Sequence, residues 1–440
     1  MSVVDRLKRL TGENADAEQR EKDAKQRQLE NLRGRIERIL ERRPGAGATT
    51  PSAAVPDRRL PPLGLNDVAS GREYQTPHGP VFVVEDDIDV GEFWGRRRLR
   101  EFAALNTRAA ALLARDGRVA EYDPADALFL DTETTGLSGG TGTFAFLIGL
   151  GWVERERFVT RLIFARDFLE EAAALHTLTE FAAQKKYLIT FNGRTFDVPL
   201  LTTRFVLNRA PDSLADLPHL DLLAPARRLL GHRLPNSRLT TLEAEVLGVR
   251  RDGDIPGSEI PQRYFDFLHT RDARLVADIL KHNRLDVVSM AVLAAHMSEL
   301  LTHGPDTPDA ETDDVVAAAR LHLLRGDPVT AERFLCKIVA ADPKHQRDAA
   351  GRELSMLFKR SQRAEPAVAL WREMLVHDSK DLFAGEELAK HLEHRERRFR
   401  EAIAVVQRLL AGCPADEKIR AALAHRLARL QRKAEKDQTE

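Results

Sequence analysis

Two short apolar segments flank a pair of carboxylates and a glycine-rich loop in residues 127–151, ALFLDTETTGLSGGTGTFAFLIGLG. Residues 128–130 and 144–150 have the length and composition of buried strands, and the glycines between them suit a turn. Because residues i and i+2 of a strand point to the same face, Asp131 and Glu133 should lie side by side where the first strand leaves the core. Two like charges held this close cost free energy unless something neutralises them, and hard divalent cations do so. The alternative is that Asp131 caps a turn and that Glu133 is solvated.

The chain has 440 residues, enough for about three domains, and a formal net charge of −1. No global basic field attracts nucleic acid, so such binding would depend on local patches or on metal ions. The two cysteines, Cys336 and Cys413, lack CxxC spacing, which excludes a disulfide framework and a cysteine zinc site. No apolar run approaches the ~20 residues of a membrane span, and the N-terminus lacks the apolar core of a secretory signal. We therefore expect a cytoplasmic protein.

Two N-terminal segments differ in composition from the rest of the chain. Residues 1–44 are rich in Arg, Lys, Glu and Gln and predict a charged helix. A 3-4-3 spacing within this helix is formed by Leu29, Leu32, Ile36 and Ile39. We favour a solvated helix, because short helices without packing are marginal, over a helix for docking or self-association. Residues 45–72 are rich in Pro, Ala and Gly and predict a linker.

Residues 73–124 predict an N-terminal extension that packs on the domain after it. Residues 81–84 predict a short strand, and WGRRRLREFAAL at 94–105 predicts the start of a helix. A dense basic cluster in this segment is formed by Arg96, Arg97, Arg98 and Arg100. We favour a solvated face over contact with phosphates for this cluster, because charge runs are usually solvated.

Residues 125–302 mix strand and helix patterns. After the opening pair of strands, a third strand is predicted at 157–165, a helix at 167–184 and a short buried strand at 187–191. A strand at 219–223 and a last long helix at about 272–301 follow. This order predicts an α/β ribonuclease-H-like domain, a mixed sheet with flanking helices, better than it predicts regular βαβ alternation.

Residues 313–433 contain a helical repeat and no strand signal. Ala331, Ala367 and Ala402 recur at intervals of 36 and 35 residues, each with an apolar residue seven positions later. Twelve positions after each alanine stand Pro, Ser and Pro. Helix–turn–helix repeats of about 34 residues that end in proline are typical of tetratricopeptide repeats. We therefore predict an all-α tetratricopeptide-like domain that receives a protein or peptide partner.

Two further acid motifs follow the first one. NGRTFD at 192–197 leaves the strand at 187–191, and Asp197 then opens a helix, either as its cap or as a further metal ligand at the same sheet edge. His282 and Asp286 share one face of the last helix, because residues i and i+4 do so. Taken alone, such a pair is more often a surface pair than a functional one.

In combination, these motifs resemble those of the DEDD superfamily of 3′–5′ exonucleases, whose fold is ribonuclease-H-like. DTETTGL at 131–137 is similar to the first motif, N-x3-F-D at 192–197 to the second and HNRLD at 282–286 to the third. More closely, residues 127–300 resemble the YprB-like ribonuclease-H-like family. The segments that carry this resemblance are DTETTGLSGGTGTFAFLIGLG, FNGRTFDVPLL, HLDLLAPARRLL, LTTLEAEVLGV, DIPG and HNRLDVVSM.

The resemblance implies a metal-dependent 3′–5′ exonuclease that acts on single-stranded DNA or RNA with two Mg²⁺ or Mn²⁺ ions. The metal ligands that it implies are Asp131, Glu133, Asp197 and Asp286, all of which offer the oxygen atoms that these ions prefer. The implied catalytic residues are His282, Asp131 and Glu133, with His282 orienting or deprotonating the attacking water. The implied substrate-binding residues are Thr134, Leu137 and Asn192.

The spacing of the third motif departs from the superfamily pattern. Where that motif uses His, five positions separate it from the Asp, whereas the subclass with Tyr uses four. His282 and Asp286 are four apart, so a histidine occupies the tyrosine position. Histidine takes up a proton near neutral pH far more readily than tyrosine, and the assignment of the general base stays open.

The alternative function is a non-catalytic ribonuclease-H-like scaffold that binds nucleic acid or protein, with the repeats as its main interaction surface. The near-neutral net charge and the altered third motif favour this alternative, and the intact acids argue against it. SGGTGT at 138–143 lacks the Gly-Lys-Ser/Thr of a phosphate-binding loop. For Asp221, at a predicted strand end, we favour a role in a turn or on the surface over an approach to the metal site.

Overall fold

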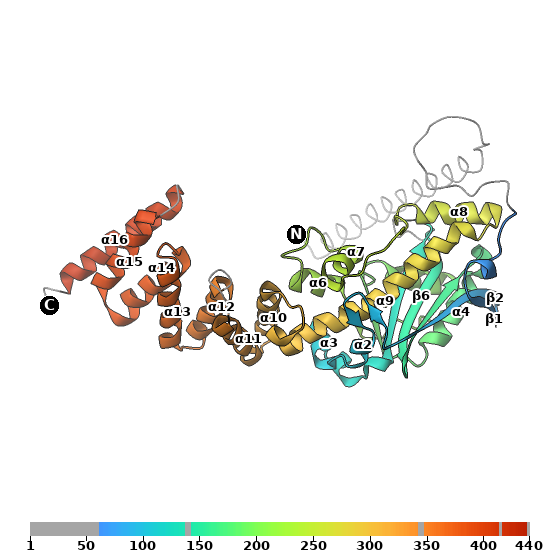
Figure 1. The fold of residues 1–440 in the computed structure, drawn as a ribbon, viewed down its shortest axis with the longest axis horizontal. Helices are drawn as coiled ribbons and strands as arrows, with labels where there is room; N and C mark the ends of the chain where they lie inside the picture. The colour runs from blue at the N-terminus through green and yellow to red at the C-terminus, as the bar shows by residue number, and fades with distance from the viewer. Residues whose placement is uncertain (1–60, 137–141, 342–346, 413–415, 438–440) are drawn as a thin grey trace, which may run out of the picture. The chain divides into compact units, whose positions relative to one another are not determined.

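The strand that carries Asp131 and Glu133 lies inside a seven-stranded mixed sheet (Figure 1). This computed structural model describes residues 61–136, 142–341, 347–412 and 416–437. The sheet order is β1 (Gly71–Thr76), β2 (Gly79–Asp89), β7 (Arg157–Phe164), β6 (Ala145–Glu154), β5 (Ala127–Thr134), β8 (Tyr187–Thr190) and β9 (His219–Asp221). β8 runs parallel to β5 and β9, and the other neighbouring strands are antiparallel. The predicted α/β ribonuclease-H-like fold is confirmed.

Alternate side chains of β5 point to opposite faces of the sheet and therefore pack against different helices. Leu128 and Leu130 pack in one cluster with α4 (Glu171–Ala182) and α5 (Asp197–Leu207). Phe129 belongs to a second cluster, which includes residues of the long helix α9 (Arg274–His303). Because alternate residues share a face, Asp131 and Glu133 leave the core on the side that α9 covers.

The other predicted elements of residues 125–302 are present. The helix predicted at 167–184 consists of η4 (Phe168–Glu170) and α4, and the strands at 157–165, 187–191 and 219–223 are β7, β8 and β9. α8 (Ile260–Thr270) packs on the sheet through Tyr264, whose ring stacks on Phe146 with centroids 3.9 Å apart. The Tyr264 hydroxyl donates to the carbonyl of Ala165 at 2.9 Å, so this buried polar group is satisfied.

The segment before β5 extends the sheet and packs against α9. The strand predicted at 81–84 is longer than expected, since β2 pairs with both β1 and β7 over most of its eleven residues. α3 (Thr107–Ala114) begins after Asn106, whose side chain accepts hydrogen bonds from the first turn, and it contacts α9. Within the segment assigned to the linker, η1 (Leu65–Asp67) packs on the core through Leu65. The predicted N-terminal helix lies outside the described residues.

The prediction of a helix start at 94–105 is only partly correct. β3 (Phe93–Trp94) and β4 (Arg97–Arg98) form a hairpin, and a helix, α2 (Arg100–Ala103), begins only after it. The reason is Gly95, whose φ of +65° is left-handed and whose Cα lies so close to the Leu247 carbonyl that a Cβ would stand 2.1 Å from it. Arg97 is buried against Glu101 and Glu299, so it belongs neither to a solvated face nor to a phosphate site.

The helices after α9 form antiparallel neighbours in chain order. They are α10 (Thr312–Leu324), α11 (Pro328–Ala341), α12 (Arg347–Arg360), α13 (Ala364–His377), α14 (Leu382–His391), α15 (Phe399–Gly412) and α16 (Glu417–Lys436). Each helix contacts the next one along the chain. Ala331, Ala367 and Ala402 are fully buried at equivalent places in α11, α13 and α15, which accounts for their recurrence. The all-α character of this region is confirmed, and its tetratricopeptide type stays a prediction.

The last helix pair is held by one buried carboxylate. Glu393 follows α14, is 2% exposed and accepts hydrogen bonds from Arg426, Arg429 and Lys433 of α16. Burial alone would raise the pKa of Glu393, but these partners lower it to about 2. The carboxylate therefore stabilises the fold above its unfolded pKa of about 4.5, and this contribution is lost as the pH falls towards 2.

Replacing Glu393 with glutamine should destabilise the protein by about 2 kcal/mol at neutral pH. The reason is that an amide keeps the shape of the side chain but loses the charge that attracts three cations. The difference from the native protein should shrink below about pH 4. Thermal unfolding across this pH range measures it, with the more exposed Glu386→Gln as control. Equal unfolding midpoints for the two variants would contradict the prediction.

Within the described part of the chain, one helix is long and apolar enough to cross a membrane by length and composition alone. It covers Arg274–Asp306, and 78% of its most apolar window is buried inside the protein. The core helix of a soluble protein passes the same test, so this is weak evidence for a membrane span. This segment corresponds to the long helix predicted at about 272–301.

Candidate active site

The end of β5 brings Asp131 against α9. The Oδ2 atom of Asp131 accepts a hydrogen bond of 2.7 Å from the side-chain amide of Asn283, which is completely buried. Gly149 of β6 lies opposite Asp131 in the antiparallel register. A Cβ on Gly149 would stand 1.9 Å from Oδ1 of Asn283, so the amide fits there only because this position has no side chain.

The second motif reaches the same place from the end of β8. Asp197 is the first residue of α5 and is 8% exposed. Its Oδ1 atom accepts hydrogen bonds from the backbone amide of Thr132, at 3.1 Å, and from the Thr132 hydroxyl. Thr132 lies between Asp131 and Glu133, so these bonds fix Asp197 beside the first motif.

The turn before Asp197 is held by Asp221. Its carboxylate accepts from the backbone amides of Asn192 at 2.8 Å and Arg194 at 3.1 Å. Asn192 has a left-handed φ of 68°, a conformation that Asn tolerates better than most residues. Asp221 therefore has the turn role that was predicted for it.

His282 of α9 faces the acids of the first and third motifs. Its Nε2 atom lies 3.9 Å from Oε1 of Glu133 and 3.7 Å from Oδ2 of Asp286, one helical turn further on. Its Nδ1 atom lies 2.8 Å from Oδ1 of Asp254. Because a carboxylate only accepts hydrogen bonds, Asp254 favours the tautomer with the proton on Nδ1. The Nε2 atom faces the acid cluster.

Arg251 is the cation of this cluster. Its side chain is 5% exposed and binds Glu243, Asp254 and Asp286. Burial alone would lower the pKa of Arg251, but the charges of Asp286 and Glu243 raise it, so the guanidinium stays charged. Asp286 is therefore partly neutralised by protein, unlike the acids on β5.

The acids of β5 are in an environment that disfavours their charges. Burial raises the pKa values of Asp131 and Glu133 well above their usual range, and the charges of Asp286 and Asp197 raise them further. Burial also raises the pKa of Asp197 to about 6, although its hydrogen bonds with Thr132 oppose the shift. The cluster therefore holds more negative charge than Arg251 alone compensates.

The structure brings together five of the residues selected from the sequence, which are Asp131, Glu133, Asp197, Asp286 and His282. Thr134 ends β5 and donates its hydroxyl to the Gly136 carbonyl at 2.9 Å. Asn192 reaches the same sheet edge through its backbone contact with Asp221. Leu137 lies outside the described residues.

Sequence reasoning assigned no role to Asn283, Thr132, Asp254 or Arg251. Two of them were adjacent to selected residues, since Asn283 follows His282 and Thr132 follows Asp131. Asp254 begins the DIPG segment that contributed to the family resemblance, which was the available signal for it. Arg251 offered no signal, because two of its three partners, Glu243 and Asp286, lie on separate helices.

In the described ranges, no three His, Cys, Asp or Glu side chains are arranged closely enough to hold a metal ion as they stand. Asp286 is bound by Arg251, and Asp131 and Asp197 accept hydrogen bonds from Asn283 and Thr132. The chemistry of the donor set nevertheless fits hard divalent cations, because the four carboxylates supply only oxygen and the charges of Asp286 and Asp197 act unfavourably on Asp131 and Glu133. Coordination by all four would require Asp286 to exchange Arg251 for a cation.

Replacing Gly149 with alanine should displace Asn283 and destabilise the protein by about 2 kcal/mol or more. Asp131 should lose its amide partner in the same step. Urea unfolding measures the stability, and Gly117→Ala, where a Cβ meets nothing within 4 Å, is the control. If both variants unfold at the same urea concentration, the close packing of Asn283 on Gly149 is not important for stability.

Comparisons with known proteins place the chain in a family. Residues 128–298 match the family described as the RNase_H superfamily. The chain is 35% identical over 319 residues to the uncharacterized protein YprB of Bacillus subtilis (strain 168), which covers 71% of this chain and 76% of YprB. The chain belongs to the ribonuclease-H-like family that includes YprB.

Proposed function

We propose that this protein is a metal-dependent nuclease that hydrolyses phosphodiester bonds of single-stranded DNA or RNA as a 3′–5′ exonuclease. The observation that carries the proposal is the convergence of Asp131, Glu133, Asp197, Asp286 and His282 at one end of β5. Membership of the RNase_H superfamily suggests a nucleic-acid-related activity and supports the class of substrate.

The four carboxylates of Asp131, Glu133, Asp197 and Asp286 would hold two Mg²⁺ or Mn²⁺ ions. Such ions, when bound, lower the pKa of water and stabilise the charge on the leaving oxygen. The chain's own contribution is to position the ligands. Asn283 orients Asp131, and Thr132 orients Asp197. Asn283 binds one carboxylate oxygen of Asp131, and Thr132 binds one carboxylate oxygen of Asp197. These hydrogen bonds do not use the second oxygen of either acid.

His282 would act on the attacking water. Asp254, 2.8 Å from Nδ1, would hold a proton on that atom, and the Nε2 atom faces Glu133 and Asp286. A water between these groups would find a proton acceptor in Nε2. This arrangement favours His282 as the base in spite of its spacing of four residues from Asp286.

The other parts of the proposal concern binding. Thr134 and Leu137, after the first motif, would seat the terminal nucleotide, and Asn192 would position the substrate near Asp197. The repeat helices would receive a protein or peptide partner. A cytoplasmic location is part of the same proposal.

The second candidate is a scaffold without catalysis. The observation that favours it is the bond from Arg251 to Asp286, because the guanidinium already occupies one of the four acids. A scaffold would keep Arg251 in place and would take up no Mn²⁺. The raised pKa values of Asp131 and Glu133 argue for the nuclease, since a scaffold gains nothing from unneutralised buried acids.

Labelled single-stranded DNA and RNA, incubated with Mn²⁺ or Mg²⁺, test the nuclease. The Asp197→Asn variant should lose on the order of 10²- to 10³-fold or more in rate, because it removes one charged ligand. Asp216→Asn, at an exposed position, is the matched control. Single-nucleotide products from a 3′ end are expected. The proposal would be contradicted if the native protein hydrolysed neither substrate, or if the native protein and the Asp197→Asn variant had equal rates.

A further inference from the structure

Phe168 is an exposed aromatic residue next to the candidate site. It begins η4, and its ring centroid lies 5.1 Å from that of Phe144 and 6.5 Å from that of Tyr264. Phe144 and Tyr264 are buried, whereas Phe168 is 52% exposed and Leu169 after it is still more exposed. One side of the Phe168 ring therefore packs on the core, and the rest faces solvent.

Phe144 joins Phe168 to the strand that carries the acids. Its carbonyl accepts a hydrogen bond of 2.9 Å from the backbone amide of Thr135, and its own amide donates to the Thr135 hydroxyl at 3.0 Å. Thr135 follows Glu133 by two residues. Glu133 pairs with Leu147 in the antiparallel register, and Leu147 packs in one cluster with Phe144. Because paired residues point to the same face of a sheet, these rings and Glu133 lie on the same face.

Two hydrogen bonds hold Phe168 in place. The Asp167 side chain accepts from the backbone amide of Leu169 at 2.9 Å, and the Glu170 side chain accepts from the backbone amide of Arg166 at 2.8 Å. These bonds fix the turn on both sides of Phe168. A side chain that is held in this way loses little conformational freedom when a ligand binds to it.

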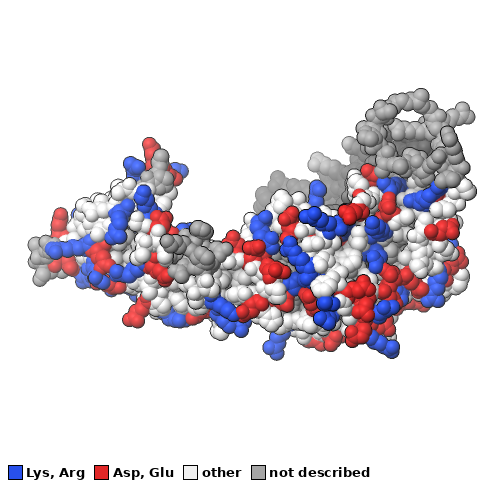
Figure 2. All heavy atoms as spheres, in the orientation of Figure 1, with Lys and Arg blue, Asp and Glu red and all other residues white. Residues whose placement is uncertain are grey.

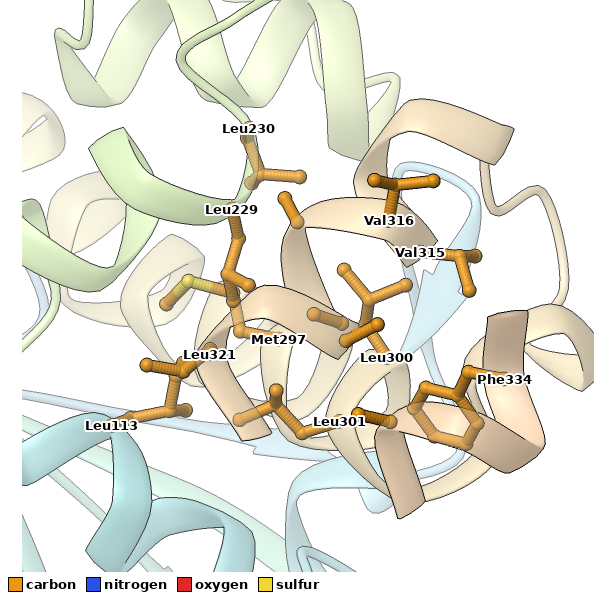
Figure 3. Close-up of a cluster of buried hydrophobic side chains, with 14 of the residues drawn as sticks. Leu113, Leu229, Leu230, Met297, Leu300, Leu301, Val315, Val316, Leu321 and Phe334 are labelled. Atoms are coloured by element: carbon orange, nitrogen blue, oxygen red, sulfur yellow. The ribbon is translucent and has the colours of Figure 1, made fainter. Parts of the chain in front are cut away.

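Core packing alone does not explain the exposed pair Phe168 and Leu169. Where large apolar side chains serve only the core they are buried, as are the labelled members of the cluster that joins α9 to α10 and α11 (Figure 3). Single exposed apolar residues are common on protein surfaces, but these two are consecutive and lie beside the acids. Phe93, another exposed phenylalanine, already has a partner, since the Arg98 guanidinium lies 3.9 Å from its ring centroid.

The charge of the surface favours stacking as a source of affinity for a single strand. The net charge of the chain is −1, and Figure 2 shows Lys and Arg side chains mixed with Asp and Glu over most of the face that it presents. Such a surface offers no continuous basic groove for phosphates. Proteins that bind single strands also use aromatic side chains on which bases stack, and every base has a face that can stack.

We propose that Phe168, with Leu169 beside it, forms a platform on which a base of single-stranded nucleic acid stacks, close to the 3′ end that the acids would hold. The choice of ligand rests on the proposed function and adds to it a residue that positions the strand. Because neither side chain has a hydrogen-bonding group, the platform should accept purines and pyrimidines of DNA and RNA alike.

Labelled single-stranded DNA and RNA, bound in EDTA so that no hydrolysis occurs, test the platform by fluorescence anisotropy. One abasic nucleotide is placed in turn at each position near the 3′ end. In the native protein, one of these positions should weaken binding by about 5- to 100-fold, which is the loss expected for one stacked base. In Phe168→Ala the same abasic position should cause no further loss, because the stacking partner is already absent.

Phe93→Ala is the matched control, because Phe93 is also an exposed phenylalanine, at 60%. It should bind intact and abasic strands as the native protein does. Phe168→Tyr should show the abasic loss of the native protein, since tyrosine keeps the aromatic face. A purely structural role of Phe168 would change the melting temperature of Phe168→Ala and leave its response to the abasic position unchanged.

Two outcomes would overturn the platform: the same abasic loss in the native protein and in Phe168→Ala at every position, or a native protein that binds neither nucleic acid. The separate hydrolysis assay distinguishes these outcomes from failure of the nuclease. Coupling between Phe168 and one base without any hydrolysis would retain the platform and reject the nuclease. Hydrolysis without such coupling would retain the nuclease and reject the platform.

Discussion

Replacing Asp131 with asparagine should raise the melting temperature of the metal-free protein and remove its response to Mn²⁺. Asp131 has a pKa well above its usual value, because it is buried and lies near Asp286 and Asp197. The folded protein therefore disfavours the charge of Asp131. Ionisation of Asp131 lowers the free energy of unfolding as the pH rises above the unfolded pKa of about 4. Asparagine is uncharged and can still accept the hydrogen bond of Asn283.

The size of this effect depends on pH in a defined direction. At neutral pH the variant should gain about 1–3 kcal/mol, which corresponds to a few degrees in melting temperature. Below about pH 4, where Asp131 is protonated in both states, the gain should vanish. Mn²⁺ should raise the melting temperature of the native protein, because binding to the folded state stabilises it, and should leave the variant unchanged.

Scanning calorimetry with and without Mn²⁺, at neutral pH and near pH 4, measures both parts of this prediction. Asp216→Asn serves again as control, because its carboxylate is exposed. If the Asp131 variant is less stable than the native protein in EDTA, burial and the neighbouring acids do not disfavour the charge of Asp131 as inferred. If Mn²⁺ shifts both proteins equally, Asp131 is not a metal ligand.

The parts of the fold that could be predicted are those whose signal is local. The β5–β6 hairpin follows from two apolar runs around a glycine loop, and α9 follows from a long apolar periodicity. The helix predicted at 94–105 was partly wrong because Gly95 lies against Leu247, about 150 residues away in the chain. Such a contact leaves no periodic pattern near the glycine.

The residues of the candidate site also fall into those that could be predicted from the sequence and those that could not. Asp131, Glu133, Asp197, His282 and Asp286 could be selected because acids and histidine at strand ends and at helical spacing have a chemical meaning of their own. Their supporting residues could not, since an asparagine or an arginine acquires its role only from a partner on another segment. The Asn283 amide is useful because Gly149 leaves room for it, and neither residue predicts the other.

Replacing Arg251 with methionine should destabilise the metal-free protein by about 3–5 kcal/mol. Methionine has a similar length without a charge, so Glu243, which is 1% exposed, would be left buried and unpaired. Burial already raises the pKa of Glu243 in spite of Arg251, which shows how unfavourable its charge is there. Changing Glu243 to glutamine in the same chain should restore part of the loss.

Arg251→Met should also increase the effect of Mn²⁺ on stability. The guanidinium binds Asp286, so its removal frees this acid for a cation and takes away a competing positive charge. The Mn²⁺-induced rise in melting temperature should therefore be larger in this variant than in the native protein, with the exposed neighbour Arg250→Met as control. The same Mn²⁺-induced rise in both proteins would mean that Arg251 does not compete with metal. A scaffold without catalysis would then explain the Arg251–Asp286 ion pair better than a nuclease does. A larger rise combined with slower hydrolysis would give Arg251 two roles, as the counter-ion of the empty cluster and as a group that orients Asp286.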